Sequence, residues 1–446
     1  MAGTARPNSP GGQAPIDNVR RLQRKLWAAA KQSPERRFHA LYDRIFRGDV
    51  LEEAWRRVRA NRGAAGVDRM TLAQVEVYGV QRLLDGLARD LRAGRYRPAP
   101  ARRVDIPKPD GRMRPLGIPT VGDRIVQQAA KLVLEPLWEA DFLPVSYGYR
   151  PRRSATDALE AIRVAFPRGY RFVVEFDIRD FFGSIGHGRL MELVGRRVSD
   201  RRVRRLVRLW LQAGVLADGR FQETVTGTPQ GGVISPLLAN IYLHELDRAW
   251  AERGNGGLMV RYADDGVVLC KTRSQAEQAL ALVGEILAGL GLELHPDKTK
   301  VVDLTQGREG FDFLGCHFHA RVSGRLLERG IRRYYLQRWP SQRAMKRVRQ
   351  RVKALTGRSR CHTDIRETIA ELNSVLRGWG GYFRTGNAAD KFTQLDRYVV
   401  WRLRGLLVGR YGRNLHAGRS QGWTREWFEG HGLYRLRGTI RYPGAA

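Results

Sequence analysis

The chain has 446 residues and a formal net charge of +34, from 79 Lys and Arg against 45 Asp and Glu. Hydrophobic residues make up 42% of it, enough for buried cores, so the charge indicates a polyanionic partner rather than disorder. No apolar stretch reaches the roughly 20 residues that span a bilayer, and three scattered cysteines exclude a disulfide framework. We therefore expect a cytoplasmic, nucleoid-associated protein of two or three domains without a membrane partner.

Residues 1–17 are rich in proline and glycine and lack the apolar core of a signal peptide, so they predict a disordered tail. Residues 18–95 predict a helical extension. Its first part carries apolar side chains at helical spacing, as in Leu22, Leu26 and Trp27, with arginine and lysine on the other faces. Such a basic face is either solvated or bound to RNA, and the sequence is compatible with both.

A β-hairpin is predicted over residues 97–119, because β-forming residues flank a Pro109-Asp110-Gly111 turn. Lys108 and Arg114 stand on either side of that turn. A hairpin can present both side chains to one triphosphate, which arginine binds through two hydrogen bonds and lysine binds as a point charge. The alternative is a pair of exposed cations on a surface hairpin.

Asp177 stands near the end of a predicted strand, residues 172–178, after an almost continuous run of β-forming residues. This run indicates a strand that is largely buried. A carboxylate at its end costs free energy unless a cation or a hydrogen-bond donor compensates it. Asp177 therefore predicts either a hydrogen-bonded structural residue or a ligand of a divalent cation.

Farther along, Pro229-Gln230-Gly231 predicts a loop before a helix that begins near Pro236. Gly231 has no side chain, so the backbone there can approach a duplex or a nucleotide. Gln230 can hydrogen-bond a ribose or a base edge in the minor groove. The alternative is an ordinary glycine turn before a helix.

Tyr262-Ala263-Asp264-Asp265 lies between two apolar runs, which predicts a strand, a tight acidic turn and a second strand. One interpretation is a surface hairpin with solvated aspartates. The other is a metal site, since Mg²⁺ prefers carboxylate oxygens and shares substrate phosphates. The third carboxylate, Asp177, in a matching strand context favours the metal site.

The composition changes after about residue 330. Residues 331–360 contain eleven Lys and Arg and no Asp or Glu, and we expect them to be helical. A one-sided basic helix with aromatic residues among the cations is typical of a nucleic-acid groove. Amphipathic helices are predicted over residues 369–382 and 392–407. Earlier, Cys316-His317-Phe318-His319 alternates as a strand does and has no accompanying cysteine pair, so we do not expect zinc.

Several further motifs accompany these, and the whole series keeps one order along the chain. The series comprises Asn61-Arg62-Gly63-Ala64-Ala65-Gly66-Val67-Asp68, Ile106-Pro107-Lys108, Arg114-Pro115-Leu116-Gly117, Ser146-Tyr147-Gly148-Tyr149-Arg150-Pro151, Phe176-Asp177-Ile178-Arg179-Asp180-Phe181-Phe182, Pro229-Gln230-Gly231-Gly232, Tyr262-Ala263-Asp264-Asp265, His295-Pro296-Asp297-Lys298-Thr299, Phe313-Leu314-Gly315 and Arg377-Gly378-Trp379. In this order the motifs resemble those of the reverse transcriptases encoded by bacterial group II introns, the intron maturases. The resemblance runs through nearly the whole chain from about residue 18.

The resemblance implies an α+β fold: a right-hand polymerase with fingers and palm over residues 96–325 and an α-helical thumb, the maturase X domain, over residues 326–446. The HNH-like cluster of some relatives is not found after Asn414, so we expect no endonuclease domain. The implied activity is RNA-directed DNA polymerisation by a two-metal mechanism with Mg²⁺, or Mn²⁺ in its place. The implied partners are group II intron RNA, an RNA template with a DNA primer, and dNTPs.

The resemblance also implies roles for single residues. Asp177 and Asp264 match the essential pair of metal ligands, and Asp265 matches the assisting one. Phe182 matches the residue that packs under the deoxyribose, where a 2′-hydroxyl would clash; core packing is its alternative. The remaining candidate substrate contacts are Lys108, Arg114 and Gln230.

The resemblance favours an intron polymerase that also assists splicing and mobility by target-primed reverse transcription. Two alternatives stay open. One is a reverse transcriptase recruited by the host or used in defence, without an intron partner. The other is an RNA-binding splicing factor whose polymerase has decayed. The second predicts damaged metal carboxylates, and all three are present. The oligomeric state does not follow from the sequence.

Overall fold

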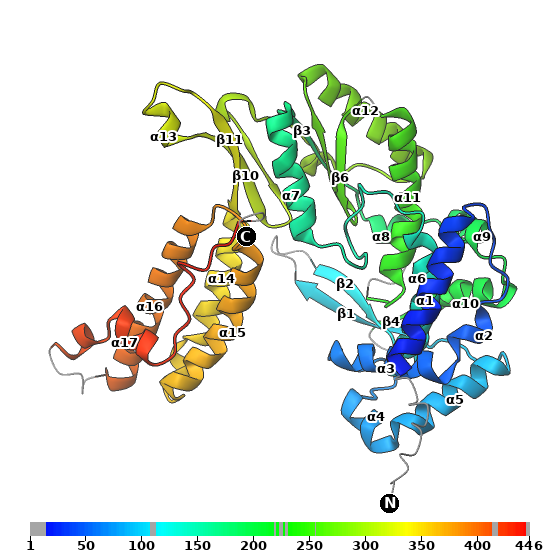
Figure 1. Cartoon of the computed structure of the whole chain (residues 1–446). Helices are drawn as coiled ribbons and strands as arrows, with labels where there is room; N and C mark the ends of the chain where they lie inside the picture. Colours follow the sequence, from blue (N-terminus) through cyan, green and yellow to red (C-terminus); the bar gives the residue numbers. More distant parts are fainter. Residues whose placement is uncertain are drawn as a thin grey trace, which may run out of the picture.

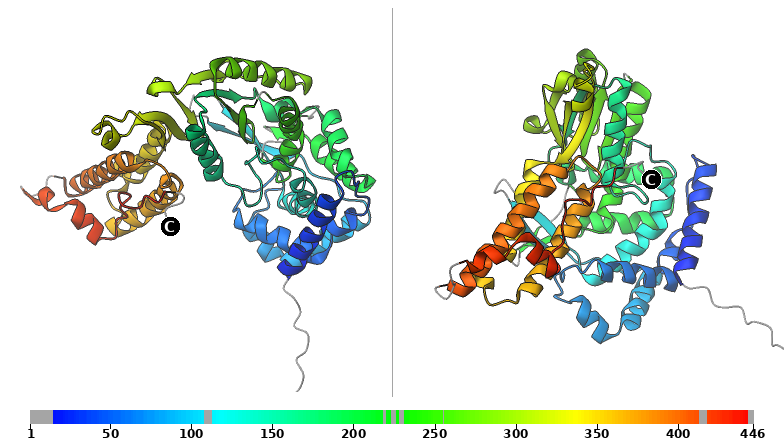
Figure 2. Two further views of the ribbon diagram at one scale, coloured as in Figure 1. Left: turned by 45° about the horizontal axis from the view of Figure 1, so that its top comes forward. Right: turned by 60° about the vertical axis from the view of Figure 1, so that its left-hand side comes forward.

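The computed structural model describes residues 15–107, 113–217, 220–222, 226–227, 231–254, 256–412 and 418–442. Within them, strands form three sheets and helices lie between the strands in sequence, which gives a mixed α/β architecture. The N-terminal and the C-terminal helices lie at opposite ends of the molecule (Figures 1 and 2). None of the described helices is both long and apolar enough to cross a membrane.

The N-terminal helices pack on one long, almost fully buried helix, α6 (Val121–Glu139). Leu22 and Leu26 of α1 are buried, while the arginines and lysines take other faces, which confirms the predicted helices of this part. The helix starts at Pro15, so the expected tail of residues 1–17 is wrong for its last three residues; residues 1–14 lie outside the described residues. The helices are α1 (Pro15–Gln32), α2 (Tyr42–Ile45), α3 (Gly48–Ala60), α4 (Leu72–Tyr78) and α5 (Val80–Arg92).

The predicted hairpin belongs to a sheet of order β2-β1-β4-β5. β1 and β2 pair antiparallel, from Arg102 opposite Ile118 to Pro107 opposite Met113, which confirms the hairpin. Its turn, residues 108–112, lies outside the described residues. The elements of this region are β1 (Ala101–Pro107), β2 (Met113–Ile118), α9 (His187–Arg197), α10 (Arg201–Gln212), β4 (Val215–Ala217) and β5 (Arg220–Gln222).

The central sheet has the order β6-β7-β3-β8 and is antiparallel throughout. Both faces are covered: Val174 and Val268 belong to the hydrophobic cluster that includes α11 and α12, whereas Val173 and Val267 belong to the cluster that includes α7. Burial of both faces explains why these strands read as continuous apolar runs. The elements are α7 (Ala155–Ala165), β3 (Phe172–Asp177), α8 (Phe181–Ser184), α11 (Ser235–Arg253), β6 (Leu258–Tyr262), β7 (Asp265–Cys270), α12 (Arg273–Gly289) and β8 (Lys300–Asp303).

The third sheet, of order β11-β10-β9, corrects one prediction. We expect residues 331–360 to be helical, but their first part forms a strand, β11 (Tyr334–Pro340). It pairs antiparallel with β10 (Cys316–Val322), which in turn pairs with β9 (Gly310–Phe313). The alternation predicted for residues 316–319 is confirmed. Only the later part of the predicted helix forms one, α14 (Gln342–Leu355).

The C-terminal helices pack around the hydrophobic cluster that includes α7. In α14, Met345, Val348 and Val352 are buried, while Arg347 and Arg351 are exposed, so this helix has the expected one-sided basic face. The predicted amphipathic helices at residues 369–382 and 392–407 are also confirmed. The remaining elements are α13 (Gly324–Leu327), α15 (Ile365–Phe383), α16 (Ala389–Tyr411) and α17 (Arg425–Gly430).

Candidate functional site

Neighbouring strand ends bring the predicted carboxylates together. Asp177, the last residue of β3, stands directly opposite Asp265, the first residue of the antiparallel strand β7. Asp264 precedes Asp265 in the turn between β6 and β7. Three carboxylates from two distant parts of the sequence therefore share one corner of the central sheet.

Tight backbone packing fixes the turn that carries Asp264 and Asp265. Ala263 in this turn has a left-handed backbone with φ of 57°. A Cβ on Gly266 would lie 2.1 Å from the ring of Phe176, and a Cβ on Gly148 would lie 2.4 Å from the backbone nitrogen of Ala263. The turn is therefore held between β3 and the segment before α7, and neither glycine has room for a side chain.

A buried ion pair lies beside the same turn. The side chains of Arg261 in β6 and Asp247 in α11 are both fully buried, with 2.5 Å between Nη2 and Oδ2. The Arg261 guanidinium also donates to the carbonyl oxygen of Ala263 and to Oγ of Ser146, each at 2.9 Å. A buried charge is costly when it loses its partners, so this network resists any shift of the turn.

The carboxylates repel each other in a partly desolvated corner. Restricted solvation first, and then the charges of Asp264 and Asp177, raise the pKa of Asp265 to about 7. Restricted solvation and the charge of Asp177 likewise raise the pKa of Asp264, against the opposing effect of Arg114 and Lys298. The Asp265 side chain still reaches solvent, so a cation can approach it.

This donor set suits a hard divalent cation. The Lys298 ammonium forms an ion pair with Asp177, which shows that the corner attracts positive charge. No group of three metal-binding side chains forms a ready cage in the described parts of the chain. Mg²⁺ needs no such cage, because it is commonly bound by one or two carboxylates and completes its shell with water and substrate phosphates.

The other predicted site residues divide into three groups. Arg114 of β2 lies close enough to the acidic turn to lower the pKa of Asp264, so the structure brings it to the site. Phe182 of α8 is 9% exposed and belongs to the hydrophobic cluster that includes α11 and α12. This agrees with its alternative role, packing in the core. Lys108 and Gln230 lie outside the described residues.

Gly231 has a different neighbour from the one we expect. Its φ is 116°, and a Cβ there would lie 2.5 Å from the carbonyl oxygen of Gly117 in β2. The missing side chain thus makes room for the β1–β2 hairpin. A close approach to a duplex or a nucleotide is not needed to explain this glycine.

Comparison with known proteins agrees with this geometry. Residues 106–318 match the family "Reverse transcriptase (RNA-dependent DNA polymerase)", and residues 345–427 match "Group II intron, maturase-specific domain". Protein YkfC of Escherichia coli is 37% identical over 338 residues, which are 67% of this chain and 87% of that protein. This chain belongs to the family of group II intron-encoded reverse transcriptases and maturases.

Three further proteins are similar to parts of this chain. The group II intron-encoded protein LtrA of Lactococcus lactis is 39% identical over 214 residues, 47% of this chain and 35% of LtrA. An uncharacterized 91 kDa protein in a cob intron of Schizosaccharomyces pombe is 27% identical, over 80% of this chain and 52% of that protein. A chain of a partial Cas6-RT-Cas1–Cas2 complex matches 56% of this chain and 42% of its own with 26% identity and a TM-score of 0.35.

Several residues that support the site were not predicted from the sequence. Arg261 and Asp247 belong to different elements, and nothing in their spacing signals an ion pair. Asn240 of α11 was also missed; its Nδ2 donates to the carbonyl oxygen of Gly148 at 2.8 Å. Tyr149, 52% exposed, has its ring centroid 6.3 Å from that of Tyr262. A signal did exist for these last residues, because both motifs stand out in the sequence.

Proposed function

We propose that this chain is the RNA-directed DNA polymerase of a group II intron and that it also binds intron RNA to assist splicing and mobility. The main support for this proposal is that Asp177 stands opposite Asp265 in the central sheet, with Asp264 next to Asp265. In the proposed right-hand arrangement, the central sheet is the palm and the β1–β2 hairpin belongs to the fingers, within residues 96–325. Residues 326–446 supply the thumb, and residues 18–95 are the N-terminal extension.

Asp177, Asp264 and Asp265 are the proposed ligands of Mg²⁺, or of Mn²⁺ in its place. When bound, the cations would activate the primer 3′-hydroxyl and neutralise charge on the leaving pyrophosphate. Arg114, whose charge acts on Asp264, would bind the triphosphate of the incoming dNTP. Lys298 balances the charge of Asp177 and supplies an ammonium group beside the phosphates.

The proposed partners agree with the charge of the molecule. A net charge of +34 favours a polyanion, and the acidic corner is a local exception within it. Template and primer would meet that corner, while the basic helices bind intron RNA. The proposed location is the cytoplasm, in association with the nucleoid. Intron RNA sequences in the DNA that flanks the gene would distinguish an intron protein from a host-recruited enzyme.

The first test is primer extension on an RNA template with Mg²⁺, using Asp177→Asn. We expect extension to fall by about a thousandfold, which corresponds to about 4 kcal/mol of transition-state stabilisation. The variant should remain folded, because the change removes one of three mutually repelling charges. Melting temperature measured alongside extension checks this.

Asp85→Asn is the matched control, since Asp85 is an exposed carboxylate on α5, far from the central sheet in sequence and structure. It should extend primers at the wild-type rate. Wild-type extension by folded Asp177→Asn would remove Asp177 from the site and contradict the proposed polymerase centre.

A further inference from the structure

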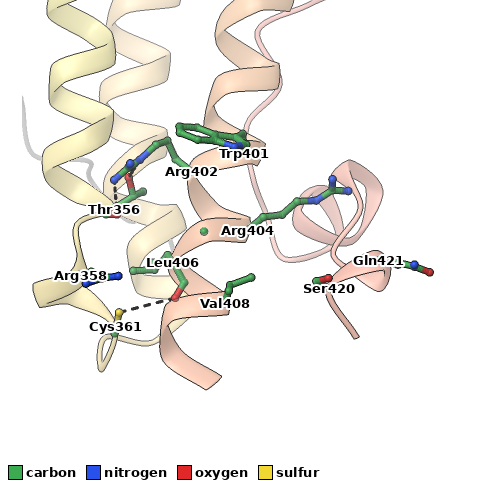
Figure 3. Close-up of a pocket in the computed structure, with 11 residues that line it drawn as sticks. Thr356, Arg358, Cys361, Trp401, Arg402, Arg404, Leu406, Val408, Ser420 and Gln421 are labelled. Carbon is green, nitrogen blue, oxygen red and sulfur yellow. Dashed lines mark hydrogen bonds between the residues drawn. The ribbon is translucent and has the colours of Figure 1, made fainter. Parts of the chain in front are cut away.

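A hollow of about 580 Å³ lies among the C-terminal helices, within the residues that match the maturase-specific domain (Figure 3). Its walls are the end of α14, the short helix at Arg358–Arg360, α16 and the short helix at Arg419–Gly422. The volume is in the range of pockets that bind small molecules. It is also remote in sequence from the carboxylate corner.

The lining of this hollow is positively charged. Arg358, Arg402 and Arg404 contribute to it, and no acidic side chain lines it within the described residues. Three like charges around one space repel each other, so their arrangement is stabilised by an anion between them. Figure 3 shows Arg358 and Arg404 on different walls of the hollow.

Two of these arginines are held in place by hydrogen bonds to backbone carbonyl oxygens and to one threonine hydroxyl. Arg402 donates from Nε to Oγ1 of Thr356 at 3.0 Å and from Nη2 to its carbonyl oxygen at 2.8 Å. Arg404 donates from Nε to the carbonyl oxygen of Trp423 at 2.5 Å. Their positions are thus fixed before any ligand arrives, which lowers the entropy cost of binding.

A flat aromatic surface adjoins these cations. Trp401 is 63% exposed, and the Arg402 guanidinium lies 5.7 Å from its ring centroid. The Tyr398 ring lies 5.8 Å from that of Trp401, and Arg349 approaches Tyr398 at 5.7 Å. Exposed aromatic rings interleaved with arginines are the means by which proteins stack unpaired bases and hold their phosphates.

We propose that this pocket binds an unpaired nucleotide of RNA. The base stacks on Trp401, and the flanking phosphates contact Arg358, Arg402 and Arg404. The inference rests on the proposed intron-RNA binding, which it deepens by naming the site and the kind of nucleotide. A base pair in the interior of a helix is excluded from such stacking, because its neighbours cover both its faces.

Cys361 provides a reporter inside the pocket. It lines the hollow and is partly exposed, whereas Cys270 and Cys316 are buried. Burial raises the pKa of Cys270 to about 11 and that of Cys316 to about 12, which keeps both as unreactive thiols. Alkylation of the native protein by iodoacetamide, followed by peptide mass spectrometry, therefore reads the occupancy of this pocket.

The probe is an oligouridylate of about 12 nucleotides, whose bases are unpaired. Saturating probe should slow alkylation of Cys361, and an RNA duplex of the same length should not. In Trp401→Ala, half-protection should need about tenfold more oligouridylate, the usual cost of removing one stacking platform. Trp27→Ala, which removes another exposed tryptophan, on α1, should need no more than wild type.

A second variant blocks the pocket without removing any charge. A Cβ on Gly405 would meet no atom within 4 Å, so Gly405→Leu fills the hollow and its helix tolerates the change. Oligouridylate binding, measured by fluorescence anisotropy, should weaken about tenfold. Gly378→Leu on α15 is the matched control, since that glycine also faces open space.

Three results would overturn the proposal. The first is that oligouridylate binds but leaves Cys361 unprotected, and the second is that wild type and Trp401→Ala need the same oligouridylate concentration for half-protection. The third is that oligothymidylate protects Cys361 at an equal or lower concentration than oligouridylate. The last result would assign the pocket to DNA. None of these measurements uses polymerisation, so their failure leaves the proposed polymerase standing. Conversely, if the primer-extension test contradicts the proposed polymerase, the protection of Cys361 by oligouridylate still tests the pocket.

Discussion

Phe182 combines a place in the core with a proposed contact to the substrate. It is 9% exposed, and its ring lies edge-on to that of Phe181 with 5.4 Å between centroids. Phe181 is more deeply buried, at 2%. These neighbours are the same residue type and differ in exposure, so they form a matched pair for separating core packing from substrate selection.

Phe182→Val is expected to admit ribonucleotides, because the smaller side chain leaves the space that a 2′-hydroxyl requires. The ratio of kcat/KM for dNTP over rNTP should fall by about tenfold or more, as for other changes of pocket size. Phe181→Val should lower the melting temperature and leave this ratio as it is. An unchanged ratio in Phe182→Val would assign that ring to the core alone.

At the scale of elements, β11 is a strand in a stretch that the sequence predicted as helix, and a buried arginine is one reason. The pairing partners β3 and β7 were recognisable because their inward residues are apolar. In β11 one inward residue is Arg338, 1% exposed, which breaks the apolar alternation. Its partners, Glu160 at 3.6 Å and Thr385 at 3.2 Å, lie far away in the sequence.

The candidate site shows the same limit. Asp177, Asp264 and Asp265 were predictable, because each carboxylate adjoins an apolar strand. The buried partners Arg261 and Asp247 were not, since two opposite charges in different elements give no periodic signal. Sequence thus identifies the proposed chemical groups more readily than the groups that hold them in position.

Gly148→Ala tests how strictly the acidic turn is positioned. The new methyl group would lie 2.4 Å from the backbone nitrogen of Ala263, so the turn or the segment before α7 must move. A displacement of about 1 Å at a catalytic centre can reduce the rate on the order of a hundredfold. Primer extension should fall by about that factor, while the circular dichroism spectrum stays native.

Gly188→Ala is the control for this change, because a Cβ on Gly188 in α9 would meet no atom within 4 Å. It should be as active as wild type and slightly more stable, by up to about 1 kcal/mol, because alanine favours helix. Full activity in Gly148→Ala would show that the turn tolerates displacement, and that its tight packing has no role in the chemistry.

At the scale of the whole molecule, the two proposed activities place opposite demands on charge. Cation binding needs the acidic corner, whereas intron RNA needs the basic helices. An Asp264→Asn, Asp265→Asn double variant should therefore lose cDNA synthesis but still bind and splice a cognate intron. Loss of splicing by this variant, while it remains folded, would contradict the division of labour.

Charge reversal on α14 is the complementary change. Arg347, Arg351 and Lys353 are exposed on this helix, so glutamate at all three should leave the fold intact. RNA affinity should weaken more than in the double carboxylate variant. In a plot of log affinity against log salt concentration, the magnitude of the slope should fall by about one for each phosphate that the protein no longer binds. Titrations of RNA affinity against salt, with splicing and primer extension in parallel, check both variants.

The pairing of β11 with β10 also has a consequence for how the chain is made. A ribosome releases β10 before β11, and in that interval the β10 edge offers unpaired backbone groups and the apolar side chains of Phe318 and Ala320. A fragment cut where the composition changes, near residue 330, would keep this open edge permanently. The β10 edge is therefore covered by β11, a strand that lies beyond the change in composition. A fragment that ends after Pro340 should aggregate less than a fragment that ends at residue 330.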